Sequence, residues 1–285
     1  MKQTICDLSD NGLLKVSGQD AKKLLQGQIT CHVDEITTTQ HRLGAHCNQQ
    51  GRVISLFRLF QFEGDYFLLL PRSMVFITLT ALKKYAVFYK VDLQDVSDEY
   101  TILGCVNERV TDENIAMLDI PSQITRCIIV GKTAVMQPLR DRLTKYLPAT
   151  ASTTWKYLDI QDGIPNIYPE SSGKFLPHDI NLPALNGVSF DKGCFTGQEI
   201  IARMHYRGKL KNTMHTANLS HSVPPLLSTD IYADIEGSAR PVGSVIDYCS
   251  IEPNEYRSLI LIDETNAKNN HLFQDPNNKI FFTIG

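Results

Sequence analysis

The 285-residue sequence lacks the short motifs that mark several large enzyme classes. It has no Gly-x-Gly-x-x-Gly run after an apolar strand, so a dinucleotide site has no support, and no Gly-x-Ser-x-Gly nucleophile elbow. Gly131-Lys132-Thr133 resembles the end of a phosphate-binding loop, but Arg126 stands where that loop requires its first glycine. We therefore reject a nucleotide-binding loop, and a serine hydrolase lacks its usual signature.

Long apolar runs and a strong charge of one sign are also missing. The longest apolar runs, such as residues 67–70, are far too short to cross a bilayer. A net charge of −3 argues against a general polyanion binder. No apolar signal core follows the first residues, so we expect a cytoplasmic protein that contacts no membrane. From the net charge we also expect that it does not bind nucleic acid directly.

The cysteine pattern gives no local metal signature. The seven cysteines are widely spaced and form no Cys-x-x-Cys pair, which argues against a disulfide framework, a zinc site or a self-contained iron–sulfur site. Cys31-His32 and His46-Cys47 would join a metal site only through tertiary folding. We expect no permanently bound metal.

The apolar patterns predict an α+β portion followed by a small antiparallel β-barrel. Alternating or continuous apolar stretches predict strands in the first half at residues 7–16, 41–47, 52–62, 66–70, 87–93, 101–106 and 126–130. Helical spacing and start signals predict helices at residues 21–27, 71–85 and 133–146. After residue 215 the predicted elements are short strands at residues 229–233, 241–248, 257–262 and 279–284.

Between these parts, residues 163–211 carry several prolines and little periodicity. Their aromatic and apolar residues favour an ordered loop over disorder, and long ordered loops are commonly functional. The sequence's only tryptophan, Trp155, lies just before this loop, at what looks like the start of a strand. It is either a core residue or a flat surface for stacking on a pterin ring.

Within this loop, Cys194 follows Lys192 and precedes a helix start signal. Thr196 and Glu199 have the spacing of a capping box, which would place Cys194 near the positive end of a helix dipole. A neighbouring lysine and a helix start favour a thiolate. The alternative is a small buried cysteine beside glycines that a tight turn requires. The residues alone leave both interpretations open.

The segment Lys192-Gly193-Cys194-Phe195-Thr196-Gly197-Gln198-Glu199 resembles the signature of the YgfZ-type folate-binding family. These proteins are related to the glycine-cleavage aminomethyltransferase (T-protein) and to mitochondrial iron–sulfur assembly factors. Further blocks in the same order also resemble the family: residues 25–30, 46–52, 83–88 and 175–182.

The resemblance implies an aminomethyltransferase-like fold around a central channel. Residues 1–214 would form two interleaved folate-binding subdomains, the second inserted at about residues 45–125, and residues 215–285 the barrel domain. The implied reactive positions are Cys194 and Lys192. The implied folate-binding positions are Trp155, Asn11, Gln198, Glu199, Arg203 and Arg207. Asn11 departs from the family, which has a tryptophan there, because asparagine cannot stack on a pterin.

The implied function is that of an accessory factor rather than a classical enzyme. It would bind tetrahydrofolate or a one-carbon derivative and contact iron–sulfur client enzymes or assembly proteins transiently. In this way it would support the maturation or repair of enzymes that methylthiolate tRNA. Two alternatives remain: a folate-dependent one-carbon transferase, and an RNA-contacting module that uses the basic residues after Cys194.

Overall fold

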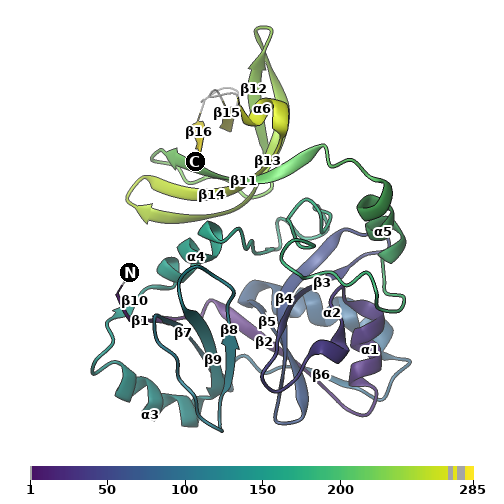
Figure 1. The fold of residues 1–285 in the computed structure, drawn as a ribbon, viewed down its shortest axis with the longest axis vertical. Helices are drawn as coiled ribbons and strands as arrows, with labels where there is room; N and C mark the ends of the chain where they lie inside the picture. Colours follow the sequence, from purple (N-terminus) through teal and green to yellow (C-terminus); the bar gives the residue numbers. More distant parts are fainter. Residues whose placement is uncertain (1, 269–271, 275–279) are drawn as a thin grey trace.

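The computed structural model describes residues 2–268, 272–274 and 280–285, which form two five-stranded sheets and a closed barrel (Figure 1). The predicted α+β class with a C-terminal antiparallel barrel is confirmed. The domain boundaries at residues 214 and about 45–125 stay predictions. In the described part of the chain, no helix combines the length and apolar character needed to cross a membrane.

The first sheet has the strand order β3-β4-β5-β2-β6, and all its neighbours pair antiparallel. Its strands are β2 (Asn11–Ser17), β3 (Arg42–Cys47), β4 (Val53–Phe62), β5 (Asp65–Pro71) and β6 (Asp92–Asp95). Both faces of β4 are covered. Leu59 belongs to a core that includes Leu24 and Leu82 of the helices, whereas Phe60 belongs to the core shared with the second sheet. Two covered faces explain why β4 is apolar at most positions.

Two α-helices and two short 3₁₀ helices accompany this sheet: α1 (Ala21–Gln28), η1 (Val33–Glu35), η2 (Arg72–Met74) and α2 (Val75–Ala86). Both α-helices were predicted from sequence and are confirmed. The predicted strand at residues 87–93 is mostly wrong, because only β6 at its end is a strand. Val87 and Phe88, which suggested the strand, are 75% and 80% exposed in turns after α2.

The second sheet has the order β10-β1-β7-β9-β8. Its strands are β1 (Thr4–Asp7), β7 (Tyr100–Val106), β8 (Ala116–Asp119), β9 (Arg126–Lys132) and β10 (Ala149–Thr150). The helix α3 (Thr133–Leu143) packs Met136, Leu139 and Leu143 against one face of this sheet. The predicted helix at residues 133–146 is therefore confirmed to residue 143, with Pro138 inside it.

The helix α4 (Ser152–Gln161) lies next to the second sheet, with the barrel on its other side (Figure 1). Placing Trp155 at a strand start was wrong. Residues 155–160 alternate between apolar and polar in part, which resembles a strand. The buried residues Trp155, Leu158 and Asp159 are instead spaced at i, i+3 and i+4, which places them on one helix face.

The long ordered loop predicted at residues 163–211 is shorter in the structure: residues 162–197 lack regular structure, and α5 (Gln198–Arg207) follows them. Ile167, Ile180 and Leu182 of this loop are fully buried. Its backbone is also held to the first sheet, because the amide of Val53 donates to Phe175 and Val53 accepts from Gly173. Buried side chains and backbone hydrogen bonds together explain why a segment without regular structure is ordered.

The C-terminal barrel is closed in the order β11-β14-β13-β12-β15-β16. Its elements are β11 (Asn212–Ser220), β12 (Asp230–Ile235), β13 (Ser238–Glu252), β14 (Glu255–Asp263), α6 (Glu264–Ala267), β15 (Leu272–Gln274) and β16 (Ile280–Ile284). Strands β12, β13, β14 and β16 were predicted, although residue 279 of the last prediction lies outside the described residues. Strand β11 was missed because its polar residues hide the alternation.

Candidate folate site and thiol loop

A cavity of about 300 Å³, here called cavity A, is bounded by strands of both sheets, α4 and the start of the long loop. Its wall contains aromatic and aliphatic side chains together with nine polar or partly polar ones: Asp10, Asn11, Arg58, Ser152, Thr153, Lys156, Asp159, Asn166 and Tyr168. A wall that combines apolar and aromatic side chains with hydrogen-bonding groups is typical of a small-molecule site.

Trp155 lines cavity A but is only 4% exposed. Its indole lies against Gly104 of β7, where any Cβ would collide with the ring. The Arg126 guanidinium carbon lies 4.9 Å from the ring centroid. Much of the indole is thus already covered, so a ligand in cavity A meets only the remaining part.

Arg126 fixes α4 to the second sheet. Its side chain is fully buried, with Nη1 2.8 Å from Asp159 Oδ1 and Nη2 2.6 Å from Asp162 Oδ2. Burial raises the pKa of Asp159, while Arg126 and Arg58 act in the opposite direction. This buried ion-pair network sets where Trp155 and Asp159 lie on the wall of cavity A.

Lys156 connects α4 to the barrel on another side of cavity A. Its Nζ lies 2.9 Å from Oδ1 of Asp247, a fully buried residue of β13, and 4.7 Å from the ring centroid of Tyr168. The other carboxylate oxygen of Asp247 accepts from the backbone amide of Asn166. The cavity wall is therefore held by contacts among α4, the long loop and the barrel.

A second cavity of about 640 Å³, here called cavity B, adjoins cavity A. The two cavities share Leu43, Arg58 and Ile164 as lining residues. Cavity B also includes Cys31 and Asp191, so it extends to the loop that carries Lys192 and Cys194. The two volumes together fall in the range of small-molecule sites.

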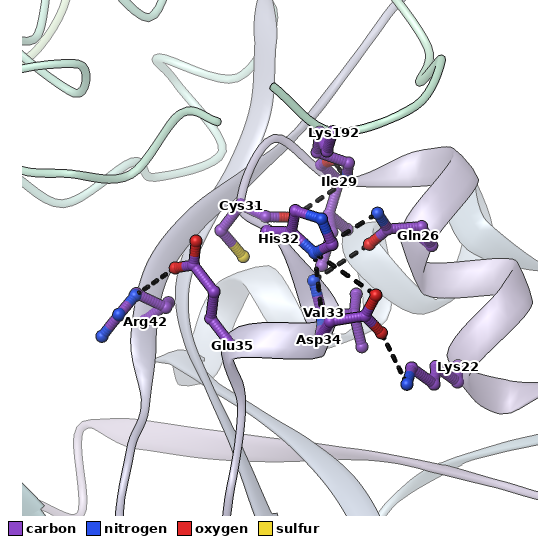
Figure 2. Close-up of polar contacts among 10 residues, drawn as sticks. All are labelled: Lys22, Gln26, Ile29, Cys31, His32, Val33, Asp34, Glu35, Arg42 and Lys192. Carbon is purple, nitrogen blue, oxygen red and sulfur yellow. Dashed lines mark hydrogen bonds and ion pairs between the residues drawn. The ribbon is translucent and has the colours of Figure 1, made fainter. Parts of the chain in front are cut away.

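Lys192 is buried against the turn that follows α1 (Figure 2). Its Nζ donates to the carbonyl oxygens of Ile29 and Cys31 at 2.7 and 2.8 Å, and it lies 5.1 Å from the Phe195 ring centroid. Among the described residues it makes no hydrogen bond to Cys194. Its ammonium group thus stabilises the backbone at Cys31, which lines cavity B. Any effect of Lys192 on the Cys194 thiol acts without a direct hydrogen bond.

The burial of Lys192 gives a testable pH dependence. Burial lowers its pKa from 10.5 to about 8. Between these values the unfolded chain binds more protons at this lysine than the folded chain, so its contribution to the free energy of unfolding rises with pH. We expect the difference in unfolding free energy between wild type and Lys192→Met to stay constant below pH 8. Above pH 8, the unfolding free energy of the wild type should rise relative to that of the variant by at most about 1.4 kcal/mol per pH unit.

Urea unfolding of both proteins from pH 7 to pH 10 measures this difference. A difference that stays flat over the whole range would show that Lys192 titrates normally in the folded protein.

Cys194 is exposed, whereas the other six cysteines are buried. The capping box predicted after it, from Thr196 to Glu199, is wrong. The N-cap of α5 is Gly197, at a φ of 82°, and it makes no side-chain cap hydrogen bond. Thr196 instead donates its hydroxyl to Gln28 Oε1 at 3.0 Å. The motif therefore docks the loop onto the end of α1, a tertiary role that local spacing does not show.

Gly197 is required by this docking. A Cβ there would lie 2.6 Å from the Asn48 carbonyl oxygen and 2.9 Å from the Gly51 Cα, and its φ is in the left-handed region. Both features exclude most other residues. The glycine thus brings the start of α5 close to the turn between β3 and β4.

The sequence-predicted site residues fall into two groups. Asn11 and Trp155 line cavity A. Four others lie on α5 and line neither cavity: Gln198, Glu199, Arg203 and Arg207. Lys192 and Cys194, which follow Asp191 of cavity B in the chain, likewise line neither cavity.

Sequence reasoning missed Arg58 and Asp159 as cavity residues. A signal for Arg58 was present, because it is the one charged residue in the ten-residue strand β4. Asp159 had no comparable signal, since its significance depends on the partner Arg126, 33 residues away in the sequence. In the described part of the chain, no three His, Cys, Asp or Glu side chains gather as a metal site would require. The expectation of no resident metal stays a prediction.

The fold is shared with a known class of protein. The chain is similar to the crystal structure of the glycine cleavage system aminomethyltransferase T from Bartonella henselae, with a TM-score of 0.71 and 13% identity over 99% of this chain and 84% of that one. The chain therefore has an aminomethyltransferase-like fold.

No family model matches the chain, but curated relatives match most of it. The chain is 33% identical to the tRNA-modifying protein YgfZ of Colwellia psychrerythraea over 244 residues, 80% of this chain and 75% of the relative. It is also 33% identical to the proteins of that name from Vibrio atlanticus (90% and 82% covered) and Klebsiella pneumoniae (85% and 80% covered). The chain belongs to the YgfZ family, as the sequence motif predicted.

Proposed function

We propose that this protein is a tetrahydrofolate-binding accessory factor that supports the maturation or repair of iron–sulfur enzymes, including enzymes that methylthiolate tRNA. It would act on client proteins transiently, in the cytoplasm. One observation carries the proposal: the chain's one exposed thiol, Cys194, lies on the loop that borders two adjoining ligand-sized cavities.

The residues of cavity A suit a reduced folate. Phe57, Trp155 and Tyr168 offer aromatic surface for a flat ring, and Asn11, Asn166 and Asp159 offer hydrogen-bonding groups for its polar edge. When bound, tetrahydrofolate supplies a carrier of one-carbon units. This chain's own residues bind it, orient it and exclude water from it.

Cys194 is the group suited to contact an iron–sulfur intermediate or a partner thiol. Burial raises the pKa of Cys31 to about 12, and burial likewise raises that of Cys47, so these two thiols stay protonated and shielded. A single thiolate does not hold a cluster by itself. The cluster would therefore be a transient cargo passed between this protein and its client.

The test is restoration of tRNA methylthiolation in a bacterial strain that lacks its own relative. Expression of this protein should restore the 2-methylthio content of bulk tRNA, measured by mass spectrometry, whereas the empty vector should not. Unmodified tRNA in cells that contain the folded protein would contradict the proposal.

A second candidate, a folate-dependent one-carbon transferase, is favoured by Asp159. It places on the wall of cavity A a carboxyl group whose pKa is raised by burial, as an acid–base group requires. Incubation of the purified protein with methylene-tetrahydrofolate and candidate acceptors distinguishes the two functions. An accessory factor should show no catalytic turnover.

A further inference from the structure

We propose that Arg58 binds the ligand's carboxylate where cavities A and B meet. The ligand class is a ring with an acidic tail, such as the glutamate-bearing tail of a reduced folate. This inference rests on the proposed function and deepens it, because it assigns one end of the ligand to one side chain.

Arg58 is buried without a direct partner. It is 8% exposed, and its guanidinium makes no hydrogen bond or ion pair with any described residue. In the sheet register it lies between Leu43 of β3 and Leu69 of β5, which offer it no polar group from their side chains. A guanidinium carries five N–H donors and stays charged, so burial without partners is unfavourable.

The nearby carboxylates do not supply the missing partner. Asp159 and Asp162 each form a direct ion pair with Arg126. Burial lowers the pKa of Arg58, and Asp159 offsets this only through space. The guanidinium therefore keeps its donors free at the wall of the two cavities, where a charge-assisted hydrogen bond can hold an anion.

The other cations of the two cavities are already paired. Three lysine or arginine side chains line the cavities: Arg42, Arg58 and Lys156. Arg42 pairs with Glu35 and Lys156 with Asp247. Among the described residues, Arg58 is thus the cavity cation that is left for an incoming anion.

The position of Arg58 favours the tail over the ring. Cavity A has three aromatic side chains on its wall and cavity B has one, Phe190, but the 300 Å³ of cavity A is at the lower end for a small-molecule site. A molecule with both a ring and a tail must therefore extend into cavity B, and Arg58 lines both cavities. The fork of a guanidinium also matches the two oxygens of a carboxylate.

The experiment uses three probes on the full-length protein, with affinities measured by calorimetry. They are tetrahydrofolate, a tetrahydropterin without a tail, and p-aminobenzoylglutamate, which has the tail without the ring. We expect Arg58→Gln to weaken binding of tetrahydrofolate and p-aminobenzoylglutamate by about 10- to 100-fold. Binding of the tetrahydropterin should not change.

Two further variants make the result specific. Arg140→Gln removes a surface arginine that pairs with Asp7 and lines neither cavity, so it should change no affinity. Arg58→Lys keeps the charge but loses the fork, so binding of the two tail-bearing probes should weaken by an intermediate amount. If Arg58→Gln does not fold, Arg58→Lys carries the test.

Equal loss for the tetrahydropterin would assign Arg58 to the ring and overturn the inference. Unchanged binding of the tail-bearing probes in Arg58→Gln would overturn it as well. If the wild type binds none of the three probes, the proposed folate function itself fails, which is a different and recognisable result.

Discussion

Replacing Cys194 by alanine should abolish the restoration of tRNA methylthiolation and leave the fold intact. Cys194 is exposed, and surface substitutions usually change stability by no more than about 0.5 kcal/mol. The melting temperature should therefore shift by less than about 2 °C. Bulk tRNA from the complemented strain gives the activity, and thermal unfolding of the purified variant gives the stability.

Cys194→Ser is the matched variant, because it keeps the size and polarity of the side chain but lacks the sulfur. It should be as inactive as the alanine variant. Brief alkylation with iodoacetamide should label one thiol per wild-type chain and none in either variant. Full restoration of tRNA modification by Cys194→Ser would show that the thiol is not the reactive group.

Replacing Arg126 by methionine should destabilise the protein by about 3–5 kcal/mol, because it leaves buried carboxylates without their cation. The Arg126 side chain is fully buried and contacts both Asp159 and Asp162. Methionine fills much of the same space but replaces neither ion pair. Urea unfolding of the wild type and the variant at neutral pH measures the loss.

Arg140→Met is the control, since it breaks an ion pair with Asp7 in which the two side chains are 41% and 39% exposed. Such surface pairs contribute about 1 kcal/mol or less. Adding Asp159→Asn to Arg126→Met should recover part of the stability by removing one stranded charge. Equal losses for Arg126→Met and Arg140→Met would contradict the structural role given to the buried network.

Much of the fold could be predicted because its signals are local. Ala21, Leu24 and Leu25 of α1 show the i, i+3, i+4 spacing of a helix, and the apolar residues of β4 show a buried strand. Local signals also misled. Part of α4 alternates between apolar and polar residues like a strand. The buried face of the helix includes Asp159, and the sequence does not show that an aspartate is buried there because its partner Arg126 is distant in the chain.

The candidate site was predictable only where a motif marked it. The family motif identified Lys192 and Cys194, but not that Lys192 reaches Ile29, 163 residues earlier in the chain. It also did not show that Thr196 bonds to Gln28 rather than capping α5. Arg58 had no motif at all. Its significance comes from the two cavities, which exist only once distant strands and loops pack together.

The most direct test of the central claim is a titration of Trp155 fluorescence with tetrahydrofolate. Trp155 is the only tryptophan and lines cavity A, so its emission reports on that one site. Folate binding there should quench the emission to a saturating value, with one ligand bound per chain by calorimetry. Unchanged emission together with no measurable heat of binding would contradict a folate site in this protein.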